Sequence, residues 1–115
     1  EPLGSTRENT RDGLAVTFWG VRGTAPVSGR GHLAFGGETI CIDVAAGSRR
    51  VIVDAGSGLA ALGRRLAGEP RSETDIVLSH FHLDHILGFM SFSPLFQPGS
   101  SVRLHAPILE GVEPE

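Results

Sequence analysis

Four metal-binding side chains occur within six residues, in the segment His80-Phe81-His82-Leu83-Asp84-His85. The segment directly follows an apolar run, residues 75–79, which predicts a buried strand. In an extended chain, residues two apart point to the same side, so His80 and His82 can reach one cation while Phe81 turns into the core. Imidazole with carboxylate suits zinc, iron or manganese, whereas calcium and magnesium prefer oxygen ligands. The segment therefore predicts a metal site at the end of a strand.

Asp84 and His85 follow in a turn or at a helix start. There Asp84 can cap the helix N-terminus or bind a second metal ion. A structural zinc site usually closes with four ligands, often cysteines, but this chain has one cysteine. That favours an open, hydrolytic site. The alternative is a polar surface turn that happens to be rich in histidine, and only the surrounding sequence separates the two.

The pattern His80-x-His82-x-Asp84-His85 resembles the HxHxDH signature of the metallo-β-lactamase superfamily. Further stretches look like the branch of that superfamily with phosphodiesterases and ribonuclease Z-like proteins. They are FWGVRGTAP at 18–26, FGGETIC at 35–41, VIVDAGSG at 51–58, HILG at 85–88, FSP at 92–94 and VRLHAP at 102–107. Glu38 departs from the pattern, because this branch usually carries Asn there. We expect this change to alter a local loop contact and not the chemistry.

The resemblance implies an α+β fold, the αββα sandwich that the superfamily builds from two similar halves. A complete domain of this kind needs about 200 residues or more, whereas the chain has 115. We therefore expect residues 14–115 to be the N-terminal half, a mixed sheet with helices on one face. Residues 1–13 are expected to be a disordered or tag-like tail. The family's remaining ligands, a His, a metal-bridging Asp and a final His, would come from the second half.

The same resemblance implies a metal-dependent hydrolase, with a phosphodiesterase as the first choice. It assigns two divalent ions to the site, zinc first, with manganese or iron as alternatives. His80 and His82 would bind one ion, and Asp84 and His85 would bind the other and serve catalysis through a bridging hydroxide. The implied substrate is a small phosphodiester or a nucleotide-like molecule. Alternatives are a thioesterase or lactonase, or a truncated, non-catalytic half-domain, and the 115 residues alone are expected to be inactive.

Two candidate residues lie outside the ligand segment. Asp54 ends a β-branched run at the carboxyl end of a predicted strand, where a buried carboxylate must be hydrogen-bonded. The resemblance implies that Asp54 is an outer acceptor for a metal-bound imidazole, with direct ligation as the alternative. Arg22 belongs to the glycine-rich stretch Gly20–Gly37, and it is our candidate for neutralising the charge of an anionic substrate.

Hydrophobic periodicity predicts the other elements. A helix is expected over 59–67, because Leu59, Leu62 and Leu66 recur at helical spacing. A short helix is expected over 84–89. The expected strands are 14–19, 39–45, 50–54, 75–79 and 102–106.

Charge and hydropathy restrict the partners. A net charge of −3 gives no bulk attraction to nucleic acid, so RNA is an option that charge does not indicate. No apolar run of membrane-spanning length and no apolar leader are present, which predicts no membrane partner and a cytoplasmic location. The predicted strands carry consecutive apolar residues, as strands covered on both faces do. We expect the missing C-terminal half, or a second copy, to cover the exposed sheet.

Overall fold

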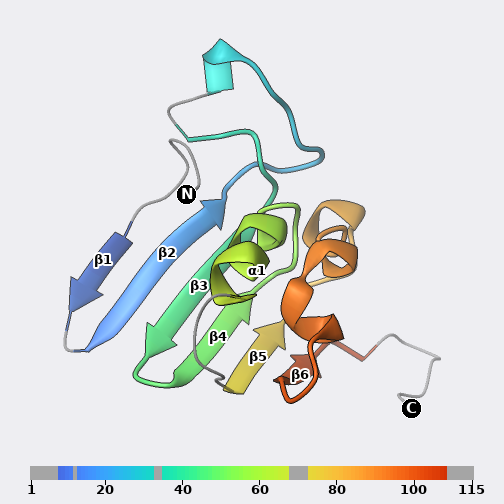
Figure 1. The fold of residues 1–115 in the computed structure, drawn as a ribbon. Coiled ribbons are helices and arrows are strands. Elements are labelled where there is room, and N and C mark those ends of the chain that lie inside the picture. Colours follow the sequence, from blue (N-terminus) through green and yellow to red (C-terminus); the bar gives the residue numbers. More distant parts are fainter. Residues whose placement is uncertain (1–7, 12, 33–34, 68–72, 109–115) are drawn as a thin grey trace.

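The computed structural model describes residues 8–11, 13–32, 35–67 and 73–108, which form a mixed sheet with its α-helix and the turns of residues 83–96 on one face (Figure 1). The sheet contains six strands in the order β1-β2-β3-β4-β5-β6. These are β1 (Glu8–Arg11), β2 (Leu14–Gly20), β3 (Cys41–Ala46), β4 (Arg49–Val53), β5 (Glu73–Val77) and β6 (Ser101–His105). The helices are α1 (Leu59–Ala67) and the 3₁₀ turns η1 (Arg30–His32), η2 (Leu83–His85), η3 (Phe89–Ser91) and η4 (Ser93–Phe96). The expected α+β class is confirmed.

Strand pairing changes from antiparallel to parallel at β4. Strands β1 to β4 pair antiparallel, and Gly47, at a φ of 59°, makes the tight turn between β3 and β4. Strands β4, β5 and β6 pair parallel, so their carboxyl ends lie at one edge of the sheet. The chain leaves β4 at Asp54 and leaves β5 just before the histidine segment. The topology therefore places the two sets of candidate residues side by side.

Helix α1 covers one face of the sheet, and its bounds match the expected range of 59–67. Its buried residues include Leu59, Leu62 and Leu66, whereas Arg64 and Arg65 are exposed. The helix shares its core with Ile52 of β4, Ile76 of β5 and Phe92, all fully buried; the other members are Trp19, Cys41, Ala55 and Leu78. Burying each large side chain contributes about 1.5–3 kcal/mol. No helix within the described ranges is long and apolar enough to cross a membrane.

The opposite face of the sheet has no helix over it in the part of the chain that the structure describes (Figure 1). Along each strand, the residues next to the core residues in sequence point to this uncovered face. Two of them, Val51 and Val77, remain 37% and 38% exposed. Its β4–β6 side carries charges around Asp75, which lies 3.0 Å from Arg103 Nε and 2.9 Å from His105 Nε2. The open face is therefore part apolar and part charged.

The helix expected over 84–89 is wrong, because this segment forms the two 3₁₀ turns η2 and η3. An α-helix would need the His85 carbonyl to accept from residue 89. That carbonyl instead accepts the Ala55 amide at 2.8 Å, and the Gly88 amide donates to Ala55 O at 2.8 Å. The segment is thus hydrogen-bonded to the chain that leaves β4, and these bonds replace those of an α-helix. The periodicity of apolar side chains does not reveal which partner a backbone group will bond.

The first strand was also not expected, since β1 lies inside the segment predicted as a tail. Its residues pair with β2 from Glu8 opposite Thr17 to Arg11 opposite Leu14. The segment is polar throughout and has no alternation of apolar residues. Its pairing therefore uses backbone groups, which any sequence except proline supplies. Residues 1–7 lie outside the described residues.

Replacing Gly88 by Ala is expected to destabilise the fold. A Cβ atom there would lie 2.0 Å from the Gly56 carbonyl oxygen and 2.9 Å from Leu59 Cβ. Backbone cannot move aside as a side chain can, so we expect a loss of at least about 2 kcal/mol in the free energy of unfolding. Urea denaturation measures it. Gly31→Ala is the matched control, since nothing lies within 4 Å of its Cβ position, and equal stability of both variants would contradict the close packing.

Candidate metal centre

The chain leaves β5 into a turn that gathers three imidazoles. The His82 carbonyl accepts the His85 amide at 2.9 Å, and this bends the segment back on itself. The His80 ring centroid lies 4.5 Å from that of His82 and 4.0 Å from that of His85. Phe81 was expected in the core but is 38% exposed, because the strand ends at Val77 and its alternation does not extend so far.

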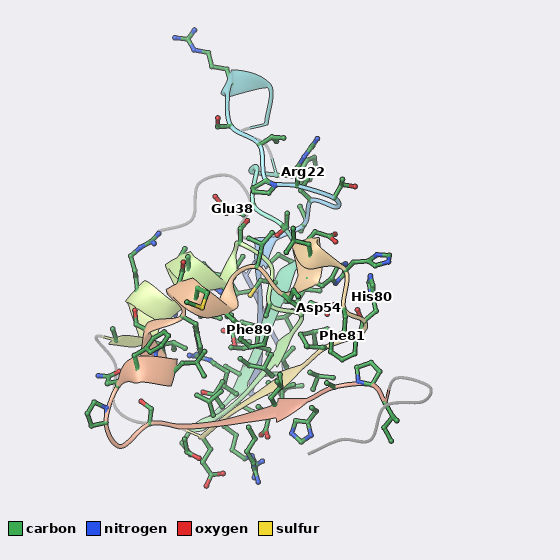
Figure 2. All side chains as sticks on the ribbon, turned by 90° about the vertical axis from the view of Figure 1, so that its right-hand side faces the viewer. Arg22, Glu38, Asp54, His80, Phe81 and Phe89 are labelled. Carbon is green, nitrogen blue, oxygen red and sulfur yellow. The ribbon has the colours of Figure 1, made fainter. Side chains whose placement is uncertain are left out.

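Asp54 lies under this turn and is almost fully buried, with 4% of its surface exposed. Figure 2 shows it beside His80. Its carboxylate accepts the Ser79 amide at 2.9 Å and the Ser79 hydroxyl at 2.9 and 3.0 Å. The other contact is to His85 Nδ1 at 3.0 Å. The structure thus brings Asp54 to the imidazoles through hydrogen bonds, as an outer acceptor requires.

The contacts of Ser79 and Asp54 favour one tautomer for two of the imidazoles. An ionised carboxylate only accepts, so the Ser79 hydroxyl proton points to Asp54 and the hydroxyl oxygen can accept from His80 Nδ1 at 2.9 Å. His85 Nδ1 likewise donates to Asp54. In the neutral form, each ring in this arrangement carries its proton on Nδ1, which leaves Nε2 with a free lone pair. This is the tautomer that a metal-binding imidazole needs.

Asp84 lies on the other side of His85, with Oδ2 at 3.4 Å from His85 Nε2. With the His85 proton on Nδ1, His85 Nε2 and Asp84 Oδ2 are both acceptors and face each other. A divalent cation between them would satisfy both atoms. Asp84 Oδ2 also accepts the backbone amide of Thr24 at 3.0 Å. This amide holds the pKa of the Asp84 carboxyl below its usual range, because a hydrogen bond from a backbone N–H favours the ionised form. Asp84 is therefore ionised at neutral pH.

The donor set fits divalent cations of the zinc, manganese and iron type. Among the described residues, no group of three His, Cys, Asp or Glu side chains is arranged to hold one ion. The described side chains lie in close pairs: the His80 ring is 4.5 Å from that of His82 and 4.0 Å from that of His85, and Asp84 Oδ2 is 3.4 Å from His85 Nε2. Each pair leaves positions of a four- to six-coordinate ion to other ligands.

The glycine-rich loop that carries Arg22 lies above this turn (Figure 2). Arg22 is exposed, and its amide donates to the Glu38 carbonyl at 3.1 Å at the base of the loop. Thr39 follows and is tied to the chain after β4, because its amide donates to Ser57 Oγ at 2.8 Å and its hydroxyl accepts the Ser57 amide at 2.7 Å. The structure therefore brings Arg22 to the loop beside the site but not into contact with the histidine rings.

Two residues of the site were missed from the sequence. Ser79 directly precedes the first histidine, so a hydroxyl next to a ligand was the available signal. Thr24 contributes a backbone amide, and no side-chain pattern can reveal such a contact. Its φ of 73°, unusual for a β-branched residue, is visible only in the structure.

The fold is α+β, a mixed sheet with imidazoles and carboxylates gathered at the carboxyl edge of its parallel strands. The chain belongs to the metallo-beta-lactamase superfamily, whose family model matches residues 34–105.

Two known proteins resemble this chain over about two thirds of its length. Ribonuclease Z of Bradyrhizobium diazoefficiens is 35% identical over 79 aligned positions, and the match covers 65% of this chain and 23% of that protein. This chain thus spans less than a quarter of its curated relative. A solved structure from Thermotoga maritima, described as a candidate metallo-beta-lactamase, is 24% identical with a TM-score of 0.42, and the match covers 69% of this chain and 39% of that chain.

Proposed function

We propose that this chain forms the metal-binding half of a hydrolase that cleaves phosphodiesters. The observation that carries the proposal is the hydrogen-bond arrangement around Asp54, which frees Nε2 of His80 and His85 for metal ions. The choice of phosphodiesters is supported by the likeness to a ribonuclease Z. The exposed Arg22 beside the site supports it too, because guanidinium recognises phosphate oxygens.

In this proposal His80 and His82 hold one divalent ion, and Asp84 and His85 hold a second. When bound, such ions polarise a phosphoryl oxygen and make a water proton easier to remove near neutral pH. Asp54 and Ser79 keep the imidazoles in the correct tautomer and orientation. Arg22 attracts the anionic substrate and lowers the cost of bringing its charge next to the carboxylates of the site.

We further propose that the open face of the sheet docks the remaining half of the domain, which would complete the metal ligands. The support is the half-buried apolar surface around Val51 and Val77. Each Å² of apolar surface that becomes buried contributes roughly 25 cal/mol to association. A second copy of the chain is the alternative occupant, and sedimentation of the isolated 115 residues would show whether copies pair.

The test of function is an assay of the full-length protein with bis(p-nitrophenyl) phosphate. We expect turnover that a chelator abolishes and that zinc or manganese restores. Arg22→Gln should lower kcat/KM for this anionic diester about tenfold, whereas Arg30→Gln, also exposed in the same loop, should not. Turnover of thioesters or lactones without turnover of diesters would contradict the substrate class and leave the metal site in place.

A further inference from the structure

Two residues in the described part of the chain have a positive φ although they are not glycine: Thr24 at 73° and Asp54 at 64°. Such conformations cost energy and persist where the surrounding structure enforces them. Both residues contact the same short segment. Asp54 binds Ser79 and His85, and the Thr24 amide binds Asp84. Backbone strain is therefore concentrated on the residues that hold the metal-binding turn.

Thr24 reaches this turn from a loop that is otherwise fixed at its base. The Arg22 amide donates to Glu38 O, and the Val27 amide donates to Gly37 O at 2.8 Å. Gly20 and Gly37 lie so close to other backbone segments that a Cβ would meet carbonyl oxygens at 1.9 and 1.5 Å. The contact between Thr24 and Asp84 joins segments 60 residues apart in the sequence. It connects the loop that carries Arg22 to the turn that carries the ligands.

We infer that Thr24 is a positioning residue whose backbone amide orients Asp84 for the second metal ion. The inference rests on the proposed function. The Thr24 amide can donate to Asp84 only when its loop is docked against the ligand turn. A metal ion that binds the oriented Asp84 carboxylate therefore also favours the docked loop. By linkage, the docked loop favours the metal to the same degree. The metal site and the substrate loop with Arg22 are thus coupled through one hydrogen bond.

The first test removes the donor and keeps the side chain. In the full-length protein, Thr24 is replaced by its α-hydroxy acid, which exchanges the amide N–H for an ester oxygen. We expect the affinity for the second zinc ion, measured by chelator competition, to fall about tenfold. Thr24→Gly is the matched control, because glycine keeps the amide and adopts a φ of 73° without strain. It should bind zinc at least as tightly as the wild type.

The second test needs no metal. Hydrogen exchange of loop residues 20–37 is measured in metal-free Asp84→Ala and Asp84→Asn. Asp84→Ala removes the acceptor and should raise exchange of the loop about tenfold, whereas Asp84→Asn keeps a carbonyl oxygen and should raise it much less. Equal exchange in both variants and the wild type, or unchanged zinc affinity in the ester variant, would overturn the inference and leave the proposed function intact. A wild-type protein that binds no zinc would overturn both.

Discussion

Replacing His80 or His82 by Ala is expected to empty the first metal site, whereas Asp84→Ala or His85→Ala should empty the second. Each change removes one member of a pair, and the partner cannot hold an ion with a single side chain. We expect the affinity of the affected site to fall at least about 100-fold in the full-length protein. Diester turnover should fall with it, because the proposed function assigns a role at the reacting group to both ions.

Metal analysis with chelator competition measures this loss site by site. His105→Ala is the matched control, since His105 is a histidine of the same chain that binds Asp75 on the open face at 2.9 Å. That variant should keep the metal content of the wild type. Unchanged metal content in all four ligand variants would show that the turn is a histidine-rich surface feature without a metal.

Asp54→Ala should have the second-largest effect, although Asp54 is not proposed to touch a metal. Its removal leaves the Ser79 and His85 donors without the buried, charged acceptor that they bond. We expect a loss of about 1–3 kcal/mol in the free energy of unfolding. Metal affinity should fall about 10–100-fold, because the tautomers of His80 and His85 are no longer fixed. Chemical denaturation and zinc competition measure the two losses separately.

Asp54→Asn separates the two roles of this carboxylate. Asn has nearly the same volume and keeps one acceptor oxygen, so stability should be largely retained. Its NH₂ group is a donor, however, and cannot accept from both Ser79 and His85. Metal affinity should therefore fall in Asp54→Asn almost as far as in Asp54→Ala. Tight zinc binding by both variants would show that Asp54 does not control the imidazoles.

Much of the fold can be predicted from the sequence where one kind of periodicity dominates. The helix 59–67 was predicted because Leu59, Leu62 and Leu66 face one core and glycine and proline follow. Strands β2 to β6 were predicted within about two residues at most of their ends, which is usual for boundaries set by hydrogen bonds. β1 and the turns η2 and η3 were not predicted, because backbone pairing decides them.

The candidate site, like the fold, could be predicted only in part from the sequence. The ligand types and the buried Asp54 are visible in the sequence, because the chemistry requires those side chains. Their arrangement depends on the parallel pairing of β4 with β5, which brings Asp54 to the segment that starts at Ser79. The contact of Thr24 with Asp84 depends on the path of a loop of 18 residues, Gly20–Gly37, with little regular structure. No local pattern encodes such a path.

The close backbone contacts of the glycines bear on how this scaffold could be re-engineered. Gly20 and Gly37 lie against other backbone segments at the base of the loop, and Gly56 and Gly88 lie against backbone at the ligand turn. These four positions should therefore be kept in any library of variants. Gly23 and Gly31 have free space at the Cβ position and no positive φ. Randomising Gly23 would place new side chains next to Arg22 at little cost in folding, and randomising Gly31 would vary the η1 turn of the same loop.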